Sequence, residues 1–321
     1  MTKRLKITAA AAALAVGITA SANAAELILA HGANAGNPRF DAANLVADLV
    51  ASCTKGALTV NVAPSATMGD DAEMLVSAQS GVIQMTANSQ GAMAQIVPEV
   101  GMLGLPFLFG SLPDAWKKLD GKVGALIDKK AQAKGMKVVG WWDNGIRNVT
   151  HVAKHMKDPA ALKGMKIRTP PDEVTLAMFK ALGANPAPLA WSELPTALRS
   201  GAFEGQENPL TNIYSAKLHD ITPYITMTGH KYESTPVVAG LAWWKGLSDA
   251  DRTCIGDAVK QAGWYQRGRS HMDNASLRAK MKAEGAKFMD VDQAAFAKAT
   301  AGVYDSYAKQ FGELITLLRE K

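Results

Sequence analysis

Strand-like and helix-like segments alternate at the start of the mature region, and this alternation constrains the fold more than any other feature. Three strand-like and two helix-like segments follow one another, at 26–31, 38–52, 57–62, 70–80 and 82–86. Gly56 and Gly81 follow the helix-like segments as stop signals. A strand–helix–strand–helix–strand order implies mostly parallel strands with helices on the faces of the sheet. The sequence therefore predicts an α/β fold.

The rest of the chain continues the mixture of helices and strands. The run Leu105–Phe109 is interrupted by Pro106, which favours a buried connection over a central strand. Ser192 is positioned to cap a helix that has Pro195 in its first turn and ends at Gly201. Further strands are predicted at 136–142, 163–168 and 237–244, and further helices at 113–133, 172–182, 249–284 and 293–318.

Residues 1–24 have the pattern of a secretory signal peptide. Three basic residues precede a mostly apolar stretch at 7–18, and Ala22-Asn23-Ala24 fits a small-residue cleavage site. The apolar stretch is shorter than the roughly 20 residues that a membrane-spanning helix needs. We expect cleavage after residue 24 and export of a chain that begins at Ala25. An oxidising compartment permits a disulfide between Cys53 and Cys254, with two buried free thiols as the alternative.

Composition and motifs argue against several functional classes. The formal net charge is +6, three of the basic residues lie in 1–24, and no dense basic stripe suggests a nucleic-acid partner. The sequence contains no nucleophile elbow, phosphate-binding loop, dinucleotide fingerprint, C-x-x-C or H-E-x-x-H motif. His151 and His155 are spaced i, i+4, but their β-branched surroundings disfavour a helix. We therefore expect no enzymatic activity, no cofactor and no metal site.

Two arginines lie where ligand sites form in α/β folds. Arg147 follows the strand predicted at 136–142, and Arg168 ends the strand predicted at 163–168. Ligands of such folds bind at the carboxyl ends of strands, and a guanidinium matches a carboxylate with two parallel hydrogen bonds. A surface ion pair is the alternative for either residue. The segment 203–210 is interpreted as a turn with convergent polar atoms, and Trp191 as a pocket floor or a core residue.

Seven short segments, taken in order and spacing, carry a family resemblance: 66–70, 105–109, 144–147, 162–170, 182–186, 205–209 and 228–230. They resemble the solute-binding receptors of tripartite ATP-independent periplasmic transporters, the dicarboxylate-receptor family. The resemblance covers essentially the whole mature chain. It implies two α/β domains with a ligand cleft between them, and a long bridging helix that matches the helix predicted from Asp249. Domain I would comprise 25–144 and 234–270, and domain II 145–233 and 271–321.

The resemblance also implies the site. Arg168 matches the arginine that clamps the ligand carboxylate, and Arg147 matches a second arginine on the same ligand. One departure is Pro171, where several members have a polar residue. Two buried guanidiniums also require either an anionic ligand or a partner among Glu193, Glu207 and Glu233. The remaining implied contacts are Asn208 as a hydrogen-bonding residue, Trp191 against the carbon body of the ligand, Asn88 and Ser89 from the first domain, and His31 to Asn34 from the first loop.

The resemblance implies a monomeric periplasmic receptor that delivers an organic acid to integral membrane subunits without ATP. A sugar acid is slightly preferred, and a C4-dicarboxylate or another carboxylate stays open. A receptor for a signalling system would share the same ligand site. An exported hydrolase is the third alternative, which the missing catalytic motifs oppose.

Overall fold

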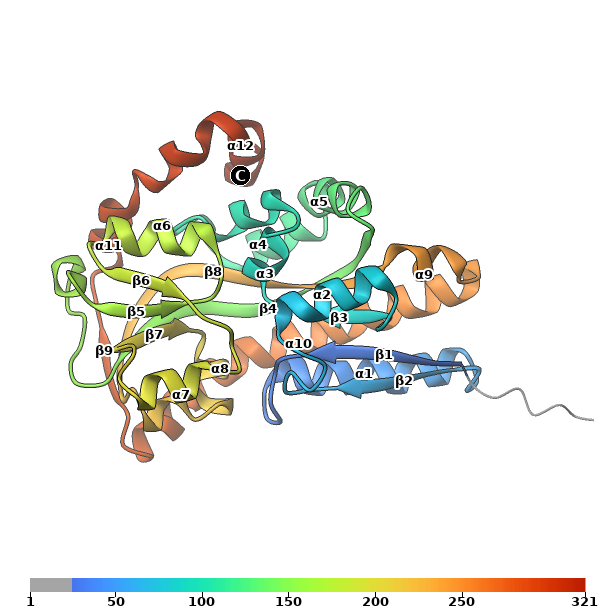
Figure 1. Cartoon of the computed structure of the whole chain (residues 1–321), viewed down its shortest axis with the longest axis horizontal. Coiled ribbons are helices and arrows are strands. Elements are labelled where there is room, and N and C mark those ends of the chain that lie inside the picture. The colour runs from blue at the N-terminus through green and yellow to red at the C-terminus, as the bar shows by residue number, and fades with distance from the viewer. Residues whose placement is uncertain (1–24, 321) are drawn as a thin grey trace, which may run out of the picture.

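A computed structural model of the protein describes residues 25–320 and contains one mixed nine-stranded sheet covered by helices (Figure 1). The predicted signal peptide, residues 1–24, lies outside the described residues. Along the sheet the strand order is β2-β1-β3-β8-β4-β7-β5-β6, and β9 pairs with β8. This order places the first three strands at one end of the sheet and β5, β6 and β7 at the other.

The observed elements follow the predicted alternation. The strands are β1 (Ala25–His31), β2 (Leu58–Ala63), β3 (Met85–Ala87), β4 (Met136–His151), β5 (Lys166–Thr169), β6 (Asn185–Pro188), β7 (Gly205–Asn208), β8 (Tyr224–Gly240) and β9 (Lys287–Asp290). The helices of the first half are α1 (Pro38–Cys53), α2 (Asp71–Ser80), α3 (Gln90–Ala94), η1 (Pro98–Gly104), α4 (Leu112–Leu119) and α5 (Lys122–Gln132). Those of the second half are η2 (Pro159–Leu162), α6 (Glu173–Ala181), α7 (Leu194–Arg199), α8 (Leu210–Ser215), η3 (Leu218–Asp220), α9 (Leu241–Gly246), α10 (Asp249–Ala283), α11 (Gln293–Thr300) and α12 (Val303–Arg319).

The first three strands form the parallel arrangement that the sequence predicted. Strand β1 pairs in parallel with β2 on one side and with β3 on the other. Helix α1 is capped by Asn37, whose side chain accepts a hydrogen bond from the backbone N–H of Arg39. We call β1, β2 and β3 with α1 to α5 the N-terminal lobe, and β5, β6 and β7 with α6, α7 and α8 the second lobe.

Two long antiparallel strands, β4 and β8, run across the middle of the molecule and join the lobes (Figure 1). They pair from Met136 opposite Gly240 to His151 opposite Tyr224, with three shifts of register. Helix α10, 35 residues long, contacts α1, β4 and α8 and so spans both lobes. Its predicted length and position are confirmed. Helix α12 contacts both α5 and α6, and the domain boundaries stay a prediction.

Four predicted boundaries are wrong. The strand predicted at 136–142 continues to His151, so Arg147 lies inside β4 rather than after a strand. The helix predicted at 113–133 is divided at Asp120-Gly121 into α4 and α5, and the helix predicted at 293–318 is divided at 301–302 into α11 and α12. The strand predicted at 237–244 ends at Gly240, and α9 follows. Short apolar runs such as this one fit a strand and a buried helix equally well.

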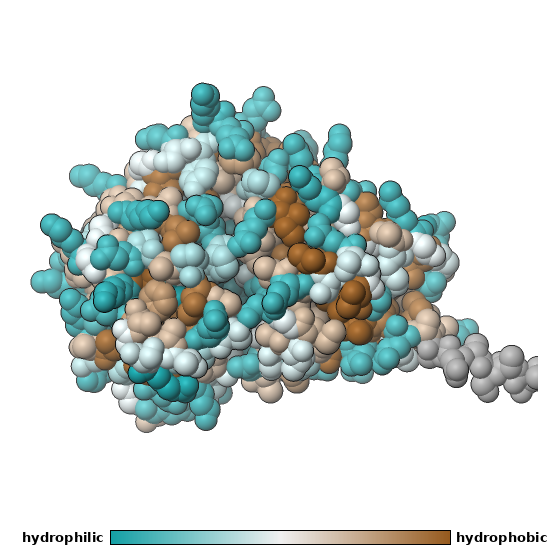
Figure 2. All heavy atoms as spheres, in the orientation of Figure 1, coloured by the Kyte–Doolittle hydropathy of each residue, from teal (hydrophilic) through white to brown (hydrophobic). Residues whose placement is uncertain are grey.

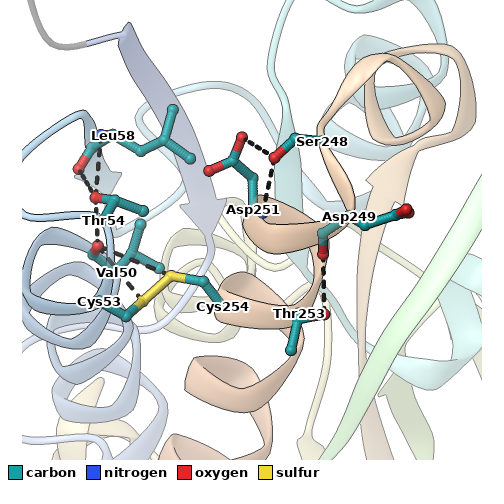
Figure 3. Close-up of a disulfide and its surroundings, with 9 residues drawn as sticks. All are labelled: Val50, Cys53, Thr54, Leu58, Ser248, Asp249, Asp251, Thr253 and Cys254. Atoms are coloured by element: carbon teal, nitrogen blue, oxygen red, sulfur yellow. Dashed lines mark hydrogen bonds between the residues drawn. A yellow bond between two sulfur atoms is a disulfide. The ribbon is translucent and has the colours of Figure 1, made fainter.

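The two cysteines form a disulfide between the C-terminal end of α1 and the first turns of α10 (Figure 3). The Cα atoms of Cys53 and Cys254 are 6.1 Å apart, and 201 residues separate them in sequence. This resolves the alternative left open by the sequence. The bond connects the start of the bridging helix to the apolar core that Val46, Val50 and Ile255 share.

The described surface is mixed in character. On the face seen in Figure 2, hydrophilic residues divide the hydrophobic groups into small patches. None of the described helices has an apolar stretch long enough to cross a membrane.

Removing the disulfide should lower the thermal stability of the protein. A Cys53→Ser, Cys254→Ser double variant is expected to lose roughly 2–4 kcal/mol of unfolding free energy, because the unfolded chain is no longer cross-linked over a long loop. Thermal unfolding followed by circular dichroism measures the change. A reducing agent should lower the melting temperature of the wild type and leave that of the variant unchanged. Equal melting temperatures of oxidised wild type and variant would contradict a stabilising bridge.

Candidate functional site

A small cavity lies between the two lobes and is the candidate ligand site. Its volume is about 130 Å³. The N-terminal lobe supplies residues from the loop after β1 and from the starts of α1, α2 and α3, and the second lobe supplies residues from β5, β7 and α8. Both lobes therefore contact whatever occupies it. Five of the eight predicted site residues line it, namely Ser89, Arg147, Arg168, Trp191 and Asn208.

Arg168 is a buried cation without a carboxylate partner among the described residues. It lies in β5 with 2% of its surface exposed. Its Nε and Nη2 donate to the carbonyl oxygen of Leu189 at 2.9 and 2.6 Å, and these are the only hydrogen bonds of its guanidinium within residues 25–320. Burial, with Arg147 nearby, lowers the pKa of Arg168 to about 10. Because Nη1 of Arg168 makes no hydrogen bond to the described residues, it is available to an anion in the cavity.

Arg147 differs from Arg168 because its charge is already compensated. Its guanidinium forms ion pairs with Glu207 of β7 and Glu233 of β8, and Nη2 also donates to the Glu207 carbonyl oxygen at 2.6 Å. Burial acts to lower the pKa of Arg147, but the two carboxylates outweigh it and raise that pKa. Burial acts to raise the pKa of Glu207, but Arg147 and His230 hold it at about 2. Arg147 thus connects three strands through a buried ion cluster.

The segment that contains Glu207 was interpreted as a turn, and this is wrong. Residues Gly205–Asn208 form strand β7, which is buried and pairs with both β4 and β5. A side chain at Gly205 would lie 2.1 Å from the carbonyl oxygen of Thr150, so only glycine permits this close approach of the two strands. The pairing places Glu207 opposite Val149, near Arg147.

A chain of asparagines connects the lobes beside the cavity. Asn212 of α8 donates to Asn208 and to Asn144, both at 3.0 Å, and accepts from Asn37 of α1 at 2.8 Å. Asn144 in turn donates to Glu233 at 2.8 Å. At the mouth of the cavity the Ser192 hydroxyl donates to Asp70, which bridges the lobes a second time. Ser192 was predicted to cap α7, but Glu193 occupies that position.

Arg39 was missed by the sequence analysis. It lies in the first turn of α1, lines the cavity, and is 6% exposed. Its donors reach neutral acceptors: the side chains of Asn144 at 3.0 Å and Thr235 at 2.8 Å, and the Ala87 carbonyl at 3.5 Å. Arg39 follows the first predicted strand, and ligand sites of α/β folds lie at the carboxyl ends of strands. The same argument that indicated Arg168 could therefore have indicated Arg39.

The other three predicted residues do not line the cavity. The buried His31 accepts the backbone N–H of Ala33 with its Nδ1, and burial lowers its pKa to about 3. Asn34 accepts the backbone N–H of Asn37 with its carbonyl oxygen. Asn88 is fully buried and bonds to Thr86 and to the carbonyl of Asp71. Asn88 therefore positions the start of α2, which carries Asp71 into the cavity wall.

The comparisons with known proteins agree with this architecture. Residues 29–310 match the model of the bacterial extracellular solute-binding proteins, family 7. An uncharacterised protein of Sinorhizobium fredii is 46% identical over 87% of this chain, which spans only 52% of that longer relative. A 2,3-diketo-L-gulonate-binding periplasmic protein of Escherichia coli is 33% identical, over 96% of this chain and 94% of its own.

A solved structure gives the corresponding result for the fold. It is a periplasmic solute-binding protein of a tripartite ATP-independent transporter from a Polaromonas species, bound to D-erythronate. It is 31% identical and superposes with a TM-score of 0.89 over 92% of this chain and 98% of its own. The family consists of binding proteins and not of enzymes. The chain belongs to the family 7 extracellular solute-binding proteins, the periplasmic organic-acid receptors of tripartite ATP-independent transporters.

Proposed function

We propose that the cavity binds one small sugar acid and that Arg168 takes its carboxylate. The observation that carries this proposal is the buried guanidinium of Arg168, which has no counterion among the described residues. Burying an unpaired charge is costly, so an anion that supplies the missing charge binds with a large gain in free energy. Asn208 and Trp191 then contact the remaining oxygens and the carbon body.

The size of the cavity favours a short acid. Its volume of about 130 Å³ lies well below the roughly 300–1,000 Å³ of sites for drug-sized ligands. It equals the liquid volume of about four water molecules. This supports a short acid of about four carbons.

The charges around the cavity favour a monocarboxylate with hydroxyl groups over a C4-dicarboxylate. Three arginines, Arg39, Arg147 and Arg168, lie in or beside the cavity with four carboxylates, those of Asp70, Asp71, Glu207 and Glu233. A dicarboxylate would add two negative charges to this set, which already has one carboxylate in excess, whereas a sugar acid adds one. The diketogulonate-binding relative from Escherichia coli and the erythronate-bound structure from Polaromonas bind acids of this kind.

The loaded receptor would deliver its acid to membrane subunits of a transporter. A ligand held by both lobes stabilises the closed arrangement by differential binding, and the membrane subunits would recognise that arrangement. The bonds of Asn37 to Asn212 and of Ser192 to Asp70 are the contacts that opening would break. We propose that the receptor acts as a monomer.

Replacing Arg168 should abolish acid binding. Isothermal titration calorimetry of the mature protein against D-erythronate, D-galactonate, D-glucuronate, succinate and neutral sugars gives the wild-type preference. Arg168→Met should weaken the affinity for the most tightly bound acid by at least about thirtyfold, because a charge-assisted contact contributes roughly 2 kcal/mol or more. Arg168→Lys should recover only part of the loss, because a lysine cannot form the bidentate contact.

Arg199→Met is the matched control, because Arg199 is an exposed arginine of α7 in the same lobe. It should bind like the wild type. Wild-type affinity in Arg168→Met, or a preference for neutral sugars, would overturn the proposal.

The two arginines should also differ in their effect on the ligand-free protein. Arg147→Met is expected to lose about 3–5 kcal/mol of unfolding free energy, because it leaves Glu207 and Glu233 buried without their counterion. Arg168→Met removes a buried charge that no described carboxylate pairs, so it should cost much less. Denaturant unfolding of the refolded, ligand-free variants measures both. Equal losses would show that Arg168 is as structural as Arg147.

A further inference from the structure

We propose that Arg39 and Asp71 form a second recognition subsite, in the N-terminal lobe, that binds a hydroxyl group of the ligand. This rests on the proposed function and extends it by naming the residues that select hydroxy acids. Arg39 lies in the first turn of α1 and Asp71 begins α2, whereas Arg168 lies in β5 of the second lobe. All three line the same cavity.

Arg39 has donors that the described residues do not use. A guanidinium carries five N–H groups, and those of Arg39 make three hydrogen bonds, the longest of them 3.5 Å. Its Nε is buried without a partner among the described residues. No described carboxylate pairs with it, although the two other cations buried outside the cavity, Lys231 and Arg267, each have one. A buried cation without a counterion contributes little to the stability of the fold, and it is available to bind a ligand.

Asp71 supplies the complementary acceptor. Its Oδ2 accepts the backbone N–H of Ser89 at 3.0 Å, and this bond fixes the carboxylate. Its Oδ1 has no hydrogen-bond partner within residues 25–320. That atom faces the loop after β1, where a methyl group on Gly32 would lie 3.6 Å from it and 3.6 Å from Trp191 Cδ1. The absence of a side chain at Gly32 thus keeps the space beside Oδ1 open.

A donor and an acceptor that line the same cavity fit a hydroxyl group, which accepts and donates at once. A second ligand carboxylate could accept from Arg39 but would face the negative charge of Asp71. An alkyl group would satisfy neither residue. Burial lowers the pKa of Arg39 and the charge of Asp71 opposes that effect, in keeping with their sharing one cavity. The subsite therefore selects for hydroxyl groups and against a second carboxylate.

Three four-carbon acids separate these possibilities. Butanoate, D-erythronate and succinate share one carboxylate and differ in carrying an alkyl tail, hydroxyl groups or a second carboxylate. Calorimetry should show that the wild type binds D-erythronate most tightly. Arg39→Gln should weaken D-erythronate by about tenfold to a hundredfold, the effect of losing a charged hydrogen-bond partner, with no comparable loss for butanoate. Asp71→Asn should weaken the binding of D-erythronate and strengthen the binding of succinate.

The opposite responses to Asp71→Asn distinguish recognition from a general structural defect, which would weaken all three acids. If Arg39→Gln does not fold, Arg39→Lys replaces it in the experiment, because lysine retains the positive charge. Arg39→Lys should keep part of the affinity for D-erythronate. Arg199→Gln is the control and should change no affinity. The inference would be overturned if Arg39→Gln and Asp71→Asn kept the same preference among the three acids as the wild type. It would also be overturned if the wild type bound succinate more tightly than D-erythronate. Acid binding that depends on Arg168 but on neither of these residues would leave the proposed function intact.

Discussion

The buried ion cluster of Arg147 with Glu207 and Glu233 is the interaction on which the rest of the site depends. It connects β4, β7 and β8 at the place where the two lobes of the sheet meet. Because the cluster compensates Arg147 within the fold, the two other arginines of the cavity keep their charges free for a ligand. One arginine of the cavity thus stabilises the protein, and the remaining two are available for recognition.

The proposed function links ligand binding to closure through this distribution of charge. Arg168 comes from the second lobe and Arg39 from the N-terminal lobe, so a ligand that contacts both joins the lobes. Each buried guanidinium disfavours the empty closed state, and an anion removes that cost. The hydrogen bonds among the asparagines join neutral side chains, and the bond between Ser192 and Asp70 is exposed. Both kinds of contact between the lobes can break and form again at little cost in free energy. Under the proposed function, the bound acid would determine which arrangement is populated.

Local sequence patterns predicted part of this account. The alternation at 26–86 follows from residue periodicity, and the long helix α10 follows from the absence of strong breakers over 35 residues. Arg168 was found because strand ends are recognisable in sequence. The pairing of Arg147 with Glu207 was only one of several options, because it depends on the register between β4 and β7.

Other features depend on contacts that sequence patterns do not reveal. The turn interpretation of Gly205–Asn208 failed because burial between two neighbouring strands, rather than local turn propensity, determines its conformation. Asp71 reaches the cavity because Asn88 and Ser89 hold the start of α2, a contact between segments 17 and 18 residues apart. The family resemblance named five of the residues that line the cavity and missed Arg39 and Asp71.

A crystal structure with a bound acid tests the central claim most directly. The acid to use is the one that binds most tightly in calorimetry. We expect its carboxylate to lie about 3 Å from the guanidinium of Arg168, with Arg147 still paired to both glutamates. A carboxylate bound to Arg147 in place of Glu207 or Glu233, or one that does not contact Arg168, would contradict the account.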